Sequence, residues 1–190
     1  VETLKRSLGD FARYVPAQVV RRLVTGELTA DMGGERCEIS VLFTDIAGFT
    51  TISEDMEPDQ LLHEMSEYFA TASQVLLEHG ATIDKFIGDA IMAFWNAPAR
   101  QNNHQELACR AALAVAAAIA GLNERRVAAG RPPFHTRFGL HSGEAVVGNV
   151  GSPERVSYTT IGATVNIAAR LESMNKLFGT RMLLSETALR

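Results

Sequence analysis

The chain has 190 residues and a mass of 20.6 kDa, which suits one domain with an appended segment. Its 46% hydrophobic and 21% charged residues exclude a disordered, collagen-like or disulfide-stapled protein. The 18 Lys and Arg against 22 Asp and Glu give a net charge of −4, without the basic bias of proteins that bind phosphate backbones, so we expect no nucleic acid partner.

The cysteine and hydropathy patterns indicate in which cellular compartment the chain works. Cys37 and Cys109 stand far apart without a CxxC motif or a Cys/His cluster, so the sequence predicts no disulfide framework, no zinc site and a reducing, cytoplasmic environment. The longest apolar stretch, 107–122, is interrupted by Arg110 and is shorter than the roughly 18 to 20 uncharged residues of a membrane span. The sequence opens at Val1 without a signal-peptide pattern, and we interpret it as part of a longer protein.

Residues 1–34 predict a helical linker that follows an upstream regulatory region. Apolar residues recur there at roughly helical spacing, and Pro16 marks the point where a first helix stops or a second begins. The apolar positions are Leu4, Leu8, Phe11, Val15, Val19 and Leu23. We expect this linker to pack on the following domain, 35–190, or on a second copy of the chain.

The first half of the domain alternates between strand and helix patterns. A turn-like DMGGE at 31–35 precedes 37–45, which alternates as a strand and ends at Asp45. Pro58 suits the first turn of a helix that runs to about Glu78. Residues 81–96 then predict two short strands joined by a tight turn at Gly88 and Asp89.

The second half repeats this alternation. A long helix with a small-residue face is predicted over about 103–129. The remaining predicted elements are a pair of strands with glycines at the turn over 136–151, a short strand over 157–162, a helix over 164–178 and a strand over 181–185. This order predicts an α/β fold of the α+β sandwich type: a ferredoxin-like βαββαβ core with a mixed, mainly antiparallel sheet and helices packed on it.

Two carboxylates stand out by their positions. Asp45 closes an apolar strand and Asp89 occupies a hairpin turn, so both can project from one edge of a sheet. The small residues of IAGFT at 46–50 let backbone N–H groups converge on an anion. Two hard carboxylates beside a phosphate cradle indicate Mg²⁺. The alternative is that Asp45 caps a turn and Asp89 only supplies hairpin chemistry.

A second polar group lies in the last predicted helix. Asn166 and Arg170 are four residues apart and share a helix face. Lys85, in an otherwise apolar strand, and Arg137, at the start of another, add two cations. Taken singly, Asn166 also suits a helix start, Arg170 an ordinary exposed charge, and both other cations can reach solvent.

Four motifs carry a family resemblance: VLFTDIAGFTTISE at 41–54, IDKFIGDAIMAFW at 83–95, TRFGLHSGEAVVGNVG at 136–151 and YTTIGATVNIAARLES at 158–173. In this order and spacing they resemble the catalytic domain of the class III nucleotidyl cyclases, which convert a nucleoside triphosphate to its 3′,5′-cyclic monophosphate. The segment FARYVPAQVVRRL at 11–23 also resembles the linker that precedes many bacterial members. The resemblance therefore covers nearly the whole chain.

The resemblance implies a site for metal ions and phosphates. Asp45 and Asp89, with the backbone carbonyl of Ile46, would hold two Mg²⁺ ions per site, for which Mn²⁺ can substitute. The residues implied for the β- and γ-phosphates are Gly48, Phe49 and Thr50, with Arg137 adding positive charge. One metal would lower the pKa of the ribose 3′-hydroxyl for in-line attack on the α-phosphorus, and the other would neutralise the pyrophosphate leaving group.

The resemblance also implies how the nucleoside is held. Lys85 and Thr159 fall where the family reads the purine, Asn166 would orient the ribose and Arg170 would stabilise the transition state. In the family these residues and the metal ligands come from different chains, so a homodimer with shared active sites is implied. The expected reaction is adenylate cyclisation, from ATP to cyclic AMP and pyrophosphate in cAMP signalling.

Other activities predict other residues. A guanylate cyclase is expected to carry an acidic residue at the position of Lys85. A catalytically inactive module of the same fold is expected to lack one or more of Asp45, Asp89, Asn166 and Arg170, and all four are present. A diguanylate cyclase needs a GG[DE]EF turn, and residues 33–36 read GGER.

The chain departs from the family at two places. Ala163 stands where many bacterial members carry Asp, a position that is assigned neither to metal nor to base. The family's C-terminal strands, with a lysine that contacts the triphosphate, would lie beyond Arg190. Upstream, the resemblance leaves room for a sensor or membrane domain in the full-length protein.

Overall fold

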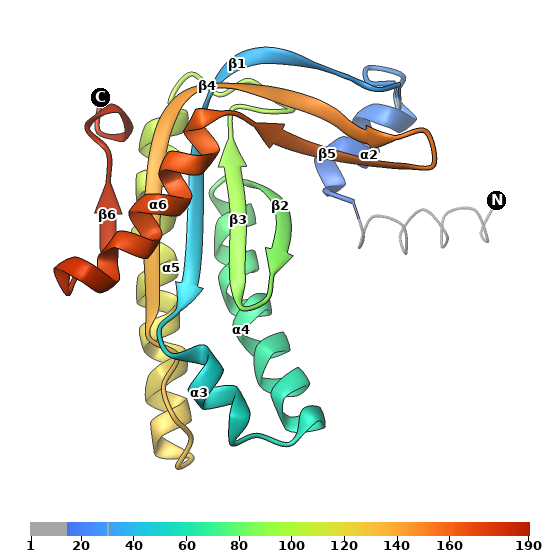
Figure 1. Cartoon of the computed structure of the whole chain (residues 1–190). Helices are drawn as coiled ribbons and strands as arrows, with labels where there is room; N and C mark the ends of the chain where they lie inside the picture. Colours follow the sequence, from blue (N-terminus) through green and yellow to red (C-terminus); the bar gives the residue numbers. More distant parts are fainter. Residues whose placement is uncertain (1–14, 30) are drawn as a thin grey trace.

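The computed structural model describes residues 15–29 and 31–190 (Figure 1). The predicted apolar positions Leu4, Leu8 and Phe11 lie outside the described residues. Helix α2 (Ala17–Val24) begins directly after Pro16, whose fixed φ and missing N–H suit a helix start. Of the two roles predicted for Pro16, the structure shows the start of a helix.

The strands form one six-stranded sheet in the order β2-β3-β1-β4-β5, with β6 paired to β4. The strands are β1 (Gly33–Ile46), β2 (Thr82–Ile87), β3 (Ala90–Trp95), β4 (Thr136–Ser152), β5 (Arg155–Ile161) and β6 (Met182–Leu184). Every pair is antiparallel except β4 with β6. With α4 (Pro58–Glu78) between β1 and β2, and α5 (His104–Ala128) between β3 and β4, this is the predicted ferredoxin-like βαββαβ core.

Strand β4 corrects two sequence predictions. It is one continuous strand of 17 residues, where a pair of strands with a glycine turn was expected. It also pairs with the start of β1, so Gly33 and Gly34 belong to a strand and not to a turn. Both errors have a common cause: the glycines make room for neighbouring segments of the chain. A Cβ at Gly148 would lie 2.5 Å from the Cα of Gly34.

The side chains of β1 alternate between two helical layers. Leu42 and Ile46 pack toward α4 and α5, whereas Ile39 and Val41 pack toward α6 (Ala163–Phe178). Figure 1 shows α4 and α5 behind the sheet and α6 in front of it. The central strand β1 is therefore covered on both faces, whereas most residues of the edge strands β2 and β5 are exposed or partly exposed.

Helix α5 is the one helix in 15–29 and 31–190 that is long and apolar enough to cross a membrane. A core helix meets the same criteria, and Ala108, Ala111 and Val115 are fully buried in the core shared with α4 and the sheet. Length and composition are thus weak evidence for a membrane span here.

Candidate active site

The end of β1 and the β2–β3 turn lie beside each other at the lower end of the sheet in Figure 1, and they carry Asp45 and Asp89. Asp45 is the second-last residue of β1, and Asp89 lies in the β2–β3 turn beside it. The backbone N–H of Ile46 donates a hydrogen bond to Asp89 Oδ2 at 2.9 Å, which ties the turn to β1. The predicted convergence of the two carboxylates at one sheet edge is therefore present.

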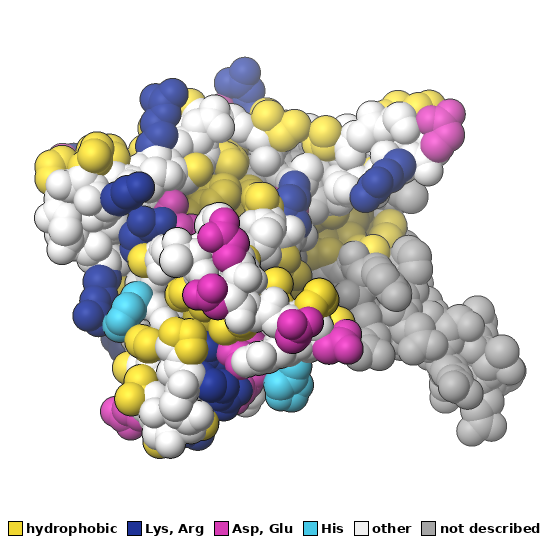
Figure 2. All heavy atoms as spheres, turned by 60° about the horizontal axis from the view of Figure 1, so that its bottom comes forward, with side chains coloured by type: hydrophobic (Ala, Val, Ile, Leu, Met, Phe, Trp, Pro, Cys, Tyr) yellow, Lys and Arg dark blue, Asp and Glu magenta, His cyan; other side chains and the backbone are white. Residues whose placement is uncertain are grey.

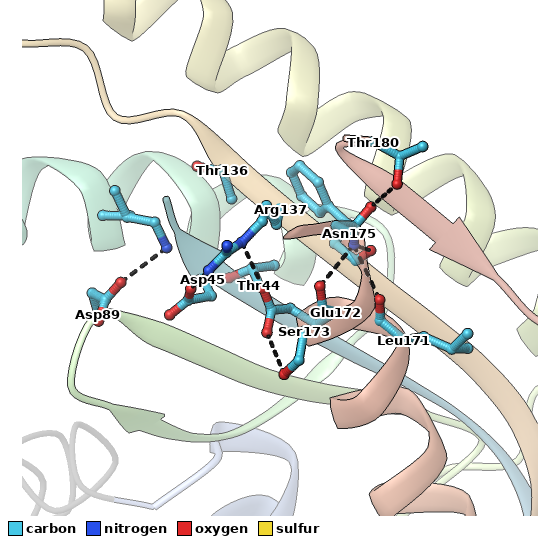
Figure 3. A network of polar contacts seen from close by, with 12 residues as sticks. Thr44, Asp45, Asp89, Thr136, Arg137, Leu171, Glu172, Ser173, Asn175 and Thr180 are labelled. Atoms are coloured by element: carbon cyan, nitrogen blue, oxygen red, sulfur yellow. Dashed lines mark hydrogen bonds and ion pairs between the residues drawn. The ribbon is translucent and has the colours of Figure 1, made fainter. Parts of the chain in front are cut away.

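Arg137 stands opposite Asp45 in the β1–β4 ladder and forms an ion pair with it. Its Nε lies 3.0 Å from Glu172 Oε1 of α6, so one guanidinium joins the sheet edge to the helix (Figure 3). Burial alone would lower the pKa of Arg137, but the two carboxylates outweigh burial and raise it. Arg137 is thus a fixed positive charge at this edge.

At this edge three carboxylates, Asp45, Asp89 and Glu172, surround one guanidinium, that of Arg137. Burial, and then the charge of Asp45, raise the pKa of Asp89 above its ordinary value. Burial and the same neighbouring charge also raise the pKa of Glu172. A cation placed between Asp45 and Asp89 would relieve this repulsion.

The donor set at this edge fits a hard divalent cation. Asp45, Asp89 and the Ile46 carbonyl supply only oxygen atoms, and Mg²⁺ binds through one or two carboxylates completed by substrate phosphates and water. In the part of the chain that the structure describes, no group of three or more His, Cys, Asp or Glu side chains could hold a metal. A metal here would thus depend on the two carboxylates and on the substrate.

The predicted phosphate turn follows β1 directly. Gly48 has φ 71° and ψ 21°, a left-handed conformation that glycine adopts without strain. This residue turns the chain into α3 (Phe49–Glu54), so Phe49 and Thr50 lie close in sequence to Asp45. Figure 2 brings this end of the molecule forward and shows acidic and basic side chains interspersed on it.

Lys85 and Thr159 form a second polar group. Lys85 of β2 and Thr159 of β5 are far apart in sequence, and Lys85 Nζ donates to Thr159 Oγ1 at 3.2 Å. Asp84 contacts both side chains. A groove of about 700 Å³ adjoins this group and is lined by Asp84, Lys85, Tyr158 of β5 and Val19 of α2, among others.

Asn166 and Arg170 are exposed on α6. Their neighbours Val165 and Ala168 pack toward the sheet, so this polar pair faces away from it. No hydrogen bond or ion pair within 15–29 and 31–190 joins either residue to Asp45. A single chain therefore does not bring them to the carboxylates through any direct contact.

Comparison with known proteins decides the family. Residues 34–189 match the family described as adenylate and guanylate cyclase catalytic domain. This chain belongs to that family. The predicted family and ferredoxin-like fold are therefore confirmed.

The cyclase domain resembles curated proteins from two bacteria. It is 47% identical to adenylate cyclase 1 of Rhizobium meliloti, over 92% of the chain and 26% of that protein. It is 33% identical to an adenylate cyclase of Anabaena cylindrica, over 98% of the chain and 38% of that protein. The chain thus spans well under half the length of these relatives.

Solved structures of both specificities resemble the cyclase domain. A bacterial light-regulated adenylyl cyclase superposes with a TM-score of 0.86 at 25% identity, over 99% of this chain and 55% of that chain. The guanylyl cyclase Cya2 superposes with a TM-score of 0.77 at 34% identity, over 83% and 79% of the two chains. Overall similarity therefore leaves the choice of base to individual side chains.

Sequence reasoning overlooked two residues of the cyclase domain. Glu172 lies on the buried stripe of α6 with Ala168 and Asn175. A carboxylate on the buried face of a predicted helix needs a partner, and this could have been inferred from the sequence. Asp84 precedes Lys85, and its importance depends on Thr159, which only the folded sheet brings near. Both carboxylates hold cations that the sequence analysis had singled out.

Proposed function

We propose that this cyclase domain is an adenylate cyclase, which converts ATP to 3′,5′-cyclic AMP and pyrophosphate. The observation that carries this proposal is the contact between Lys85 and Thr159. Adenine offers N1 as an acceptor and its 6-amino group as a donor, which a lysine donor and a threonine acceptor complement. Guanine presents an N1–H donor and a C6 carbonyl acceptor, so the same pair opposes it.

The carboxylate edge supplies the second part of the proposal. Asp45, Asp89 and the carbonyl of Ile46 would hold Mg²⁺ or Mn²⁺, with two ions per site. Such ions lower the pKa of the attacking 3′-hydroxyl and neutralise the leaving pyrophosphate. We place the β- and γ-phosphates against the turn at 48–50.

Arg137 would add positive charge toward the phosphates. Its ion pair with Asp45 competes with metal binding by that carboxylate, whereas its contact with Glu172 does not. The guanidinium therefore stays tethered to α6 when Asp45 binds a cation.

Two residues on α6 would act on the sugar and the reacting phosphate. Asn166 would orient the ribose, and Arg170 would stabilise the charge that develops on the α-phosphoryl oxygens. Because both are exposed and face away from their own sheet, we propose that a second copy of the chain supplies them. The resulting homodimer contains two shared sites, and its product would serve cAMP signalling.

Product analysis tests the proposed activity. The full-length protein and the 190-residue domain are incubated with ATP or GTP and Mg²⁺ or Mn²⁺, and cyclic nucleotides and pyrophosphate are quantified by chromatography. We expect cyclic AMP as the main product, with kcat/KM for ATP at least about fivefold above that for GTP, the size of one mismatched buried hydrogen bond.

Variants of the carboxylates test the site. Asp45→Ala and Asp89→Ala should each lower kcat at least about 100-fold, because each removes an oxygen ligand for the cations that activate the hydroxyl. Asp59→Ala, at an exposed position in the first turn of α4, should leave the rate unchanged. A folded wild-type protein that makes no cyclic AMP, or carboxylate variants with near wild-type rates, would overturn the proposal.

A further inference from the structure

Asp84, Lys85 and Thr159 form a closed triangle of polar contacts. Asp84 Oδ1 lies 3.2 Å from Lys85 Nζ, and Thr159 Oγ1 donates to Asp84 Oδ2 at 2.5 Å. The third side is the bond from Lys85 Nζ to Thr159 Oγ1, at 3.2 Å. The Asp84 side chain is 2% exposed and Lys85 45% exposed, so the carboxylate lies underneath and the ammonium lies at the surface.

A β-bulge explains how two successive residues reach one partner. In the β2–β3 ladder Ile83 pairs with Ala93 and Lys85 with Met92, so the register shifts at Asp84. Successive side chains of a regular strand point to opposite faces, and a bulge breaks that alternation. Asp84 and Lys85 can therefore both contact Thr159.

The triangle fixes the hydrogen-bonding role of Thr159. A threonine hydroxyl has one proton and two lone pairs. The proton is committed to Asp84, which as a carboxylate can only accept, and one lone pair accepts from Lys85. The hydroxyl is left with one free lone pair and no free proton, so it can only accept from a base.

The triangle also limits Lys85. An ammonium group has three N–H donors, of which one points to Asp84 and one to Thr159. One donor remains. The pair thus presents one donor and one acceptor side by side, as the N1 and 6-amino positions of adenine require.

We propose that Asp84 is a positioning residue that sets base choice by fixing the hydroxyl of Thr159 as an acceptor. This inference rests on the proposed function, because it assumes that Lys85 and Thr159 face the base. It assigns Asp84 no contact with the nucleotide. Its effect is on discrimination between ATP and GTP, beyond any effect on the stability of the edge strand.

The substitution Asp84→Asn reverses the role of the hydroxyl. Lys85 has no acceptor atom, so the new amide must turn its oxygen toward Lys85 and its NH₂ toward Thr159. Thr159 then accepts from both neighbours, and its proton is released toward the base. The freed hydroxyl proton would then face the 6-amino donor of adenine, which is unfavourable, or the C6 carbonyl acceptor of guanine, which is favourable.

The measurement is the ratio of kcat/KM for ATP to kcat/KM for GTP in one enzyme preparation. Because both values come from the same sample, incomplete folding cancels from the ratio. We expect Asp84→Asn to lower the ratio about tenfold, the effect of mispairing one buried hydrogen bond. In a Thr159→Val background no hydroxyl remains, so adding Asp84→Asn should leave the ratio unchanged.

Controls separate this inference from the proposed function. Asp59→Asn, at an exposed position of α4, should keep the wild-type ratio. If Asp84→Asn turns over neither nucleotide, discrimination is measured by binding instead. Calorimetry with 3′-deoxy-ATP and 3′-deoxy-GTP, which lack the attacking hydroxyl, then gives the ratio of the two binding affinities.

The outcomes are distinct. A wild-type protein that does not prefer ATP overturns the proposed function. A wild-type protein that prefers ATP, with an unchanged ratio in Asp84→Asn or a shift that persists without the Thr159 hydroxyl, overturns only the role of Asp84.

Discussion

A buried histidine, His104, connects a helix to the sheet through a chain of polar contacts. His104, the first residue of α5, is buried, and its Nδ1 lies 2.8 Å from Ser40 Oγ of β1. Ser40 in turn lies 2.7 Å from Ser142 Oγ of β4. This buried chain links α5 to the two central strands. Burial lowers the pKa of His104, against a smaller opposing effect of the charge on Glu38.

The burial of His104 predicts a pH-dependent stability. The folded state protonates the imidazole only at a lower pH than the unfolded chain, which takes up a proton near pH 6.5. The free energy of unfolding should therefore fall as pH decreases through about 6.5, and level off below the lowered pKa of the folded state. Denaturant unfolding between pH 8 and 5 measures this slope, with about 2.3RT lost per pH unit at most from this group.

A matched pair of variants isolates the contribution of His104. His104→Gln should make the slope between pH 7 and 5 shallower, although it also lowers stability throughout, and the remaining slope includes that of His141, whose pKa burial also lowers. His63→Gln, at an exposed position of α4, should leave the slope as in the wild type. An equal slope in all three proteins would contradict the assignment.

Helix α6 is the element on which the site depends most. It carries Glu172, which holds Arg137, and it presents Asn166 and Arg170 to solvent. Its distance from the sheet is set by Gly139 of β4. A Cβ added there would lie 2.2 Å from the Glu172 nitrogen and 2.3 Å from the oxygen of Ala168.

Two glycine substitutions should therefore act in opposite directions. Gly139→Ala should push α6 off the sheet and destabilise the domain by about 1–3 kcal/mol, as overpacking does. It should also lower kcat, because it moves Glu172 with the helix backbone. Gly121→Ala, within α5 and with nothing within 4 Å of the added Cβ, should stabilise by about 0.5–1 kcal/mol. Chemical denaturation of both variants is the measurement, and equal effects would contradict this reading of α6.

Large apolar side chains are exposed at the end of β5 and along α6. Ile161, Ile167, Met174, Leu177 and Phe178 are all at least 37% exposed. Arg170 lies in a shallow hollow among Ala169, Met174 and Leu177. An apolar surface around a proposed transition-state residue is the arrangement that a second copy of the chain would cover.

Complementation tests this assembly. Asp45→Ala and Arg170→Ala chains should each be inactive alone, because one lacks a cation ligand and the other the charge at the α-phosphate. In a heterodimer one site collects both defects and the other has none. Random mixing in equal amounts should restore about a quarter of the wild-type rate, since half of the dimers carry one intact site. Heterodimers that form but stay inactive would show that the sites are not shared.

The sequence by itself determined the order of elements and the residues with chemistry. Pro58 predicted the start of α4, and the turn at Gly88 and Asp89 predicted the β2–β3 hairpin, because proline and glycine fix local backbone geometry. Local signals failed in β4. There the glycines within 136–151 suggested a turn, whereas the structure shows one continuous strand. Gly143 of this strand leaves space for Thr164 of α6, whose Oγ1 would lie 3.0 Å from an added Cβ.

Beyond the pair Asp45 and Asp89, only the tertiary structure decided which polar side chains meet. Lys85 and Thr159 were predicted from the family resemblance to read the base, but their direct contact depends on the folded sheet, and the contacts of both with Asp84 depend on a bulge in β2. The tether of Arg137 to Glu172 likewise depends on α6 lying against Gly139. Local propensities act over a few residues, whereas these contacts join positions far apart in the chain, so they exist only once the sheet and helices have packed.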